Sequence, residues 1–275
     1  MKIPSKIYTA LIFIFLYAPI IVMIFFSFNS SSSTGLFAGF SLRWYTVLLS
    51  DKSIMQALSN TLLLAISSAL AATVIGTAAA VGIDKWKKNW VRSSVMGVTN
   101  IPMMNPEIVT GVSMMLLFVF MGRIIGQQAI LGFETLLIAH ITFNLPYVML
   151  SVLPKLRQTD PHLAEAAQDL GCTPFKAFFK SVLPSITPGI LTGLLMAFTL
   201  SLDDFIISYF TTGPGFQTLP IAIFSMTKKR VKPDMYALST LIFISILVLL
   251  ILMNVAQARG EKTKNKHKNE NRGDA

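Results

Sequence analysis

QTDPHLAEAAQDLGCTPFKAFFKSVLP, residues 158–184, joins two long apolar runs of the chain and contains two pairs of helix signals. The Asp-Pro pair at 160–161 is typical of an N-cap followed by the first helical residue, and Gly171 is a typical C-terminal stop. The Thr-Pro pair at 173–174 begins a second helix, and Pro184 lies at its far end. The stretch therefore predicts two short helices that meet at a glycine corner.

Each of these two helices has an apolar face. The faces consist of Leu163, Ala166, Ala167 and Leu170 in the first helix, and of Phe175, Phe178, Phe179 and Val182 in the second. The small side chains of the paired alanines allow another surface to approach closely. We therefore expect the segment to be a docking element.

The composition around this segment is that of a membrane protein. Hydrophobic residues make up 53% and charged residues 13% of the 275 residues, and the mean hydropathy is +0.63. A membrane helix needs about 20 apolar residues. Six runs of this kind predict an all-helical protein with six transmembrane helices, at about 7–28, 60–83, 94–121, 133–153, 186–210 and 236–256.

The first of these runs is longer than the apolar core of a signal peptide, and no small-residue cleavage site follows it, so we expect a retained helix. With the N-terminus in the cytoplasm, sixteen Lys and Arg residues lie inside and seven outside, as the positive-inside rule favours. This topology predicts a multi-pass protein of the cell membrane with both termini cytoplasmic.

The chain ends in a polar, basic segment without periodicity, residues 259–275. We expect a disordered cytoplasmic tail attracted to anionic lipid, after a transmembrane domain that spans residues 1–258; nucleic-acid binding is the less favoured alternative. The single cysteine, Cys172, and three widely separated histidines offer neither a disulfide nor a metal-ligand spacing.

The sequence EAAQDLG at 165–171, followed by SVLP at 181–184, resembles the EAA loop of ABC-importer permeases, which docks on the ATPase subunit. The resemblance implies a type I permease fold, a second homologous permease chain, and an ATPase pair that holds the ATP and Mg. It assigns ATPase coupling to Glu165, Ala166, Ala167, Gly171, Leu183 and Pro184. Ser181 departs from the usual isoleucine of the family, and an ordinary amphipathic connector is the alternative.

Further motifs extend this resemblance over nearly the whole chain. FNSS at 28–31, GFSLRWY at 39–45 and FTLSLDDFIISYFTTGP at 198–214 occur in the order and spacing of spermidine/putrescine permeases of the PotC type. The resemblance implies import of a polyamine delivered by an extracytoplasmic binding protein. A permease for another small solute is the alternative.

An argument from charge points in the same direction. The chain has a formal charge of +10, yet the ionised residues expected deep in the spans, Glu107, Asp203 and Asp204, are all acidic. An acidic interior in a basic protein suggests a cationic passenger. Ser201, Asp204, Ser208 and Thr211 fall at i, i+3, i+7 and i+10 and predict a single polar stripe along one helix face. We expect Asp204 to contact the ammonium, and Asp203 to add negative potential or to pair with a neighbour; a structural role for both is the alternative.

The other candidate path residues have competing explanations. Asn105 and Pro106 precede Glu107, so Asn105 is expected to cap a restarted helix whose first turn holds the carboxylate, an assignment as strong as a role on the path. His140 is expected to make a hydrogen bond within the bundle. Trp44 and Tyr45 suit an interfacial aromatic belt or cation–π contacts with an amine.

One basic cluster falls on the predicted outer face, against the charge rule: Lys228, Lys229, Arg230 and Lys232. Because it would repel a cationic substrate in the mouth of a path, we expect it at the rim, where it meets acidic residues of the binding protein. Anchoring to lipid headgroups is the alternative.

Two other classes of function are less consistent with the sequence. An intramembrane aspartyl protease needs two converging carboxylates, whereas neighbours on one helix diverge by about 100°. A secondary cation transporter or a channel has no use for an ATPase dock. The chain contains no Walker G-x-x-x-x-G-K-[ST] pattern, so we expect a non-enzymatic subunit that binds no cofactor itself and is driven by a partner ATPase.

Overall fold

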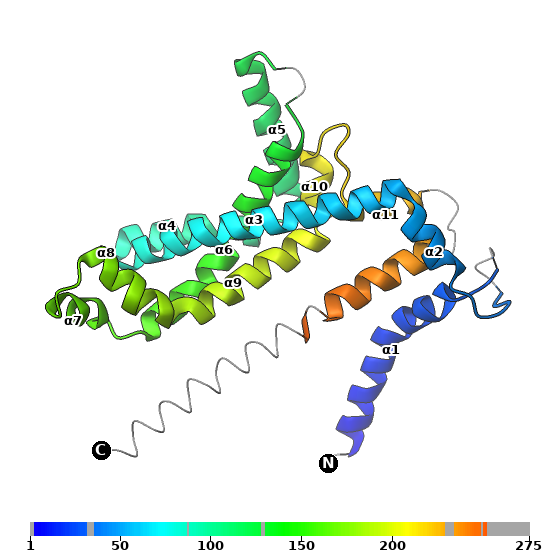
Figure 1. Ribbon diagram of the computed structural model, residues 1–275, viewed down its shortest axis with the longest axis horizontal. Coiled ribbons are helices and arrows are strands. Elements are labelled where there is room, and N and C mark those ends of the chain that lie inside the picture. Colours follow the sequence, from blue (N-terminus) through cyan, green and yellow to red (C-terminus); the bar gives the residue numbers. More distant parts are fainter. Residues whose placement is uncertain are drawn as a thin grey trace. The chain divides into compact units, whose positions relative to one another are not determined.

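The computed structural model describes residues 3–31, 36–86, 88–127, 130–228, 234–248 and 250–251. Within these residues the regular elements are helices, apart from one bridge between Asn29 and Phe40. In chain order they are α1 (Ile3–Ser27), α2 (Arg43–Ser50), α3 (Lys52–Asp84), α4 (Asn89–Met104), α5 (Glu107–Ile125), α6 (Phe133–Gln158), α7 (Leu163–Asp169), α8 (Pro174–Ala177), the π-helical turn η1 (Phe178–Val182), α9 (Leu183–Asp203), α10 (Ile206–Thr211), α11 (Leu219–Thr227) and a last helix, Asp234–Val248 (Figure 1).

Five of the helical segments are long and apolar enough to cross a membrane. They are Lys6–Ser27, Lys52–Asp84, Glu107–Ile125, Phe133–Gln158 and Pro174–Asp203. The predicted all-helical, multi-span architecture is therefore confirmed. Asp234–Val248 is a shorter apolar helix that overlaps the predicted sixth span, and part of that span (249 and 252–256) falls outside the described residues, so the count of six stays a prediction. The predicted tail, 259–275, also lies outside them.

Two of the predicted spans are not single helices. The run at 94–121 is divided at Asn105 and Pro106, because a proline cannot donate the backbone hydrogen bond that would continue α4 into α5. The run at 186–210 is divided at Asp204 and Phe205, and its first part begins earlier than predicted, because α8, η1 and α9 are continuous.

The chain divides into two compact units, one of residues 1–58 and 221–252 and one of residues 59–220 and 253–275. The first contains α1, whose large side chains are exposed all round, as expected of a helix that faces lipid or another chain. At the end of α1, the buried Asn29 side chain organises the loop to α2: its Oδ1 accepts from the Ala38 N–H at 2.9 Å and its Nδ2 donates to the Leu36 carbonyl at 2.7 Å.

The core of the second unit lies between α3, α6 and α9, which run alongside one another in Figure 1. Small residues let these helices approach closely. A Cβ added at Gly76 of α3 would lie 2.8 Å from a Val148 side-chain carbon of α6, and one at Gly189 of α9 would lie 2.8 Å from the Ser151 carbonyl of α6. The three helices therefore form a tight scaffold, from which the breaks near Asp204 and the 158–184 segment extend.

Candidate functional site

The break after α9 is stabilised by the second aspartate of the SLDDF motif. The backbone of Asp204 is extended, with φ −63° and ψ 124°. Its carboxylate accepts two backbone N–H groups of α10, from Ile207 at 3.3 Å and from Ser208 at 2.7 Å. Asp204 thus satisfies donors that the start of a helix leaves free. The predicted stripe along one continuous helix is therefore wrong.

Three of the four polar residues of that stripe, Ser201, Asp204 and Ser208, nevertheless gather around His140 of α6. Its Nδ1 lies 2.5 Å from the Ser201 Oγ, and its Nε2 lies 3.0 Å from the Ser208 Oγ and 3.4 Å from the Asp204 Oδ2. The Ser201 Oγ lies 2.7 Å from the Ser68 Oγ of α3. We call these five residues the His140 cluster. Their side chains connect α3, α6, α9 and α10, and all five are buried.

The contacts of the His140 cluster connect all of its members. Because a carboxylate only accepts hydrogen bonds, Nε2 carries the proton that faces Asp204. Nδ1 hydrogen-bonds to the Ser201 hydroxyl, which in turn hydrogen-bonds to the Ser68 hydroxyl. Every member then has a partner, as buried polar groups require. The expected hydrogen bond of His140 within the bundle is confirmed.

The two neighbouring aspartates point into different surroundings. Asp204 is 8% exposed and belongs to the His140 cluster, whereas Asp203, the last residue of α9, is exposed. A helix leaves the carbonyls of its last turn without intrahelical partners, and these give its end a partial negative charge. Asp203 adds a full negative charge to this end.

Glu107 is the third acidic residue near this end. It is exposed in the first turn of α5, after a break where Pro106, not the side chain of Asn105, occupies the N-cap position. One turn further, Gly111 lets α5 pack on α10: a Cβ there would lie 3.1 Å from the Phe210 ring. Glu107 and Asp203 are thus two exposed acids, each beside a break between helices.

Trp44 and Tyr45 lie in the first unit, at the start of α2. The Trp44 indole donates to the Asn29 carbonyl at 2.7 Å, and the Tyr45 hydroxyl lies 2.7 Å from the Ser27 hydroxyl. Both polar groups therefore fasten α2 to the end of α1. The Arg43 guanidinium carbon also lies over the Trp44 ring, 5.6 Å from the centroid of that ring.

The structure describes one residue of the predicted outer basic cluster. Lys228 is exposed, and its Nζ lies 4.6 Å from the centroid of the Phe224 ring. Lys229, Arg230 and Lys232 lie outside the described residues.

The predicted docking segment contains the expected corner. Gly171 has φ +86°, its N–H donates to the Gln168 carbonyl at 2.8 Å, and the Cys172 N–H donates to the Ala167 carbonyl at 3.1 Å. This is the Schellman arrangement, which glycine adopts without strain. The predicted glycine corner after the first helix is confirmed.

The helices on either side of the corner differ in detail from the prediction. The helix α7 begins at Leu163 rather than at Pro161, because Asp160 accepts the N–H of His162 at 2.9 Å and caps a turn before the helix. Thr173 caps α8 as predicted. That helix does not end at Pro184 but continues through η1, so Leu183 and Pro184 belong to the first turn of α9.

The exposed surface of this segment is apolar and acidic. Leu170 and Phe175 are 88% and 74% exposed, Ala166 is exposed, and Ala167 is half-buried. Glu165 is exposed and its Oε2 lies 2.9 Å from the Nδ1 of His162. This hydrogen bond raises the pKa of His162 above its usual value.

Sequence reasoning missed the roles of two residues. A serine in an apolar helix, such as Ser68, gives no signal until its partner helix is known. Asn29 was visible only as part of a family motif.

Among the described residues, no group of three or more His, Cys, Asp or Glu side chains is arranged to hold a metal ion.

Comparison with known proteins agrees with this geometry. Residues 72–263 match the family model described as binding-protein-dependent transport system inner membrane component. The putrescine transport system permease protein PotI of Escherichia coli K12 is 40% identical over 230 residues, covering 84% of this chain and 82% of the relative. The spermidine/putrescine transport system permease protein PotC of the same strain is 38% identical over 233 residues, covering 85% of this chain and 86% of the relative.

Solved structures share the fold. A chain of a bacterial ABC transporter involved in the import of the acidic polysaccharide alginate aligns with a TM-score of 0.74 and 17% identity, covering 94% of this chain and 95% of that chain. A chain of an amino acid ABC transporter aligns with a TM-score of 0.54 and 22% identity, covering 79% and 96%. The predicted ABC-importer permease fold is thus confirmed, and the chain belongs to the family of binding-protein-dependent transport system inner membrane components, the membrane permease subunits of ABC transporters.

Proposed function

We propose that this chain is a permease subunit of an ATP-driven polyamine importer of the cell membrane, with both termini in the cytoplasm. The observation that most directly supports a cationic substrate is a pair of exposed carboxylates beside breaks between helices, Asp203 at the end of α9 and Glu107 in the first turn of α5. The similarity to putrescine and spermidine/putrescine permeases over more than four-fifths of the chain supports the same substrate class.

The chemistry of this acidic pair suits an ammonium group. Two like charges raise each other's energy, and a passing cation relieves this repulsion. The carbonyls at the end of α9 add further acceptors, as the ends of broken helices do for cations in other transporters. An open site of this kind binds weakly enough to release its ligand, which transit through a path requires.

The geometry favours a reversal of the roles expected for the two aspartates. Asp204 already accepts two backbone N–H groups and faces His140, so its charge is compensated within the fold. We infer that Asp203 contacts the substrate and that Asp204 holds the break which presents Asp203. Ser201 and Ser208 then act on the path only through the His140 cluster. Trp44 and Tyr45 are proposed as a second, outer contact for an amine.

Energy comes from partner subunits in this proposal. The exposed surface of α7 and of the residue that follows it, with Glu165, Ala166 and Leu170, docks on one subunit of an ABC ATPase pair, where ATP and Mg are bound. A second, homologous permease completes the path, and an extracytoplasmic polyamine-binding protein delivers the substrate to a rim that contains Lys228, Lys229, Arg230 and Lys232. The chain itself binds no cofactor.

Reconstitution tests this function. The full complex, purified with its native partners and placed in liposomes, should import labelled putrescine or spermidine only with its binding protein outside and ATP inside. Excess unlabelled polyamine should suppress uptake, whereas neutral sugars or amino acids should not. Suppression by another small solute would instead assign the importer to that solute. Uptake driven by a membrane potential without ATP would indicate a secondary cation transporter.

A further inference from the structure

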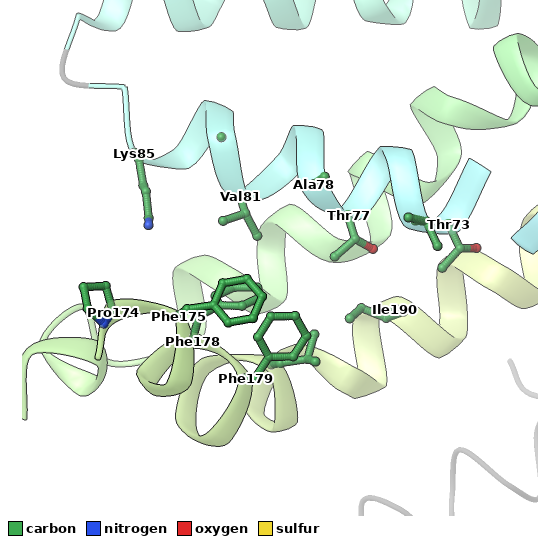
Figure 2. A pocket seen from close by; sticks show the side chains of 13 residues that line it. Thr73, Thr77, Ala78, Val81, Lys85, Pro174, Phe175, Phe178, Phe179 and Ile190 are labelled. Atoms are coloured by element: carbon green, nitrogen blue, oxygen red, sulfur yellow. The ribbon is translucent and has the colours of Figure 1, made fainter. Parts of the chain in front are cut away.

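A groove opens between the second half of α3 and the segment formed by α8, η1 and the start of α9 (Figure 2). Its volume is about 880 Å³, within the range of about 300–1,000 Å³ that is usual for small-molecule sites. In Figure 2 the rings of Phe175, Phe178 and Phe179 form one side, and Val81 and Ala78 of α3 face them from the other. The groove is part of neither the acidic pair nor the His140 cluster.

The backbone of α3 explains why this groove exists. At Gly76 the helix is pressed against Val148 of α6, where a Cβ would lie 2.8 Å from the valine side chain. Six residues further along, a Cβ at Gly82 would meet nothing within 4 Å. Helix α3 is thus held to the scaffold by one face, where Gly76, Ala80 and Ile83 are buried, and its other face, with Gly82, is open. The π-helical turn η1 places aromatic rings across the space from this open face.

The lining of the groove is hydrocarbon with one cation at its end. Thr73 and Thr77 line it with their hydroxyl oxygens buried, so they contribute mainly methyl groups. Lys85 is the one charged lining residue; it is exposed, and no described carboxylate lies within ion-pair distance of it. The long apolar floor and terminal ammonium together match an amphiphile with an anionic head.

The dimensions match one leaflet of a bilayer. From Thr73 to Lys85 α3 advances twelve residues, or about 18 Å at 1.5 Å per residue. Half of a hydrocarbon core is about 15 Å. An acyl chain that begins at the level of Lys85 therefore extends along the whole groove.

The residues that follow Lys85 have the composition of a membrane interface. Trp86 and Trp90 are 45% and 80% exposed, and Lys88 and Arg92 lie beside them in the chain. Exposed indoles and basic side chains at the end of a span are typical of the headgroup region, where anionic lipids attract lysine and arginine. Asp84 precedes Lys85, and no further acidic residue occurs before Glu107, so the segment carries a net positive charge.

We propose that this groove binds one anionic phospholipid of the cytoplasmic leaflet, with an acyl chain between α3 and the Phe175–Phe179 rings and the phosphate at Lys85. The lipid joins the open face of α3 to the segment that leads from the proposed ATPase dock into α9. The proposal depends on the membrane location and not on the identity of the transported solute.

Lipid retention tests the proposal. The full complex is purified in detergent, incubated with an equimolar mixture of palmitoyl-oleoyl phosphatidylglycerol and phosphatidylcholine, and analysed by native mass spectrometry. Wild type should retain phosphatidylglycerol in preference. Ala78→Trp, which fills the groove, should lower its retention at least fivefold. Lys85→Gln should abolish the preference between the two lipids while the assembly remains intact.

Two matched controls make this result specific. Ile75→Trp adds the same ring to an exposed position of α3 outside the groove lining, and Lys6→Gln removes a lysine near the end of another predicted span. Neither control should change lipid retention, and excess inorganic phosphate should not displace the lipid.

Unchanged lipid retention in Lys85→Gln and Ala78→Trp would overturn the proposal. If the complex with Ala78→Trp loses the second permease chain while its lipid retention is unchanged, the groove is a protein interface and the lipid proposal is overturned.

Discussion

Replacement of His140 by leucine keeps an apolar body in the scaffold and removes both ring nitrogens from the His140 cluster. The buried Asp204 then loses its imidazole contact at 3.4 Å, and Ser208 loses a partner at 3.0 Å. Ser201 keeps its contact with Ser68 at 2.7 Å, which limits the loss on that side. The substitution therefore acts mainly where α10 begins.

The magnitude follows from these contacts. A hydrogen bond to a charged group contributes about 1.5–3 kcal/mol, and a buried group left without a partner adds to the cost, so we expect a destabilisation of about 2–4 kcal/mol. At about 2–4 °C per kcal/mol for a chain of this size, the Tm of the detergent-solubilised complex should fall by about 5–15 °C. Leucine at the exposed His162 is the matched control, and its Tm should stay within about 2 °C of wild type.

A double-mutant cycle isolates the contact between His140 and Asp204. The stabilities of His140→Leu, Asp204→Asn and the double variant should give a coupling free energy of about 1–3 kcal/mol. A coupling below about 0.5 kcal/mol would refute the reasoning that the imidazole compensates the buried carboxylate, because residues that do not interact have additive effects.

Three further predictions concern the surfaces of the protein. Gly171→Val should leave the chain in the membrane but uncouple ATP hydrolysis from uptake, because φ +86° strains a β-branched residue; normal ATP-driven uptake would contradict the role of the corner. Glutamine at all four basic positions of 228–232 should weaken the docking of the loaded binding protein and reduce its salt dependence, whereas an unchanged salt dependence would favour lipid anchoring. The imidazole of His162, followed by NMR, should titrate above its usual pKa in wild type and nearer that value in Glu165→Gln. Because this pKa is raised, the His162–Glu165 pair stabilises α7 fully below the unfolded-state pKa of about 6.5 and loses that effect as pH rises through the folded-state value.

The features that were predictable from the sequence have local causes. Gly171 and Thr173 determine a corner and a cap through their own backbone preferences, so the docking segment was visible in the sequence. The break at Pro106 has a local cause as well. The apolar runs located the spans because a bilayer requires length and hydrophobicity alone.

The break at Asp204 had no such local signal. Neither glycine nor proline occurs there, and an aspartate in an apolar run gives the same pattern whether the helix continues or ends. Its cause is tertiary: the carboxylate caps α10 and meets His140 from another helix. For the same reason, the sequence did not reveal which of the two aspartates is exposed.

Uptake by aspartate variants tests the central claim most directly. Labelled putrescine import is measured in liposomes that contain the full complex with Asp203→Asn or Asp204→Asn, beside the Tm and subunit content of each complex. The account predicts that Asp203→Asn assembles normally and lowers kcat/KM for uptake by about 10- to 150-fold, the equivalent of one hydrogen bond to a charged group. It predicts that Asp204→Asn lowers the Tm. Wild-type uptake by an assembled Asp203→Asn complex would contradict the account.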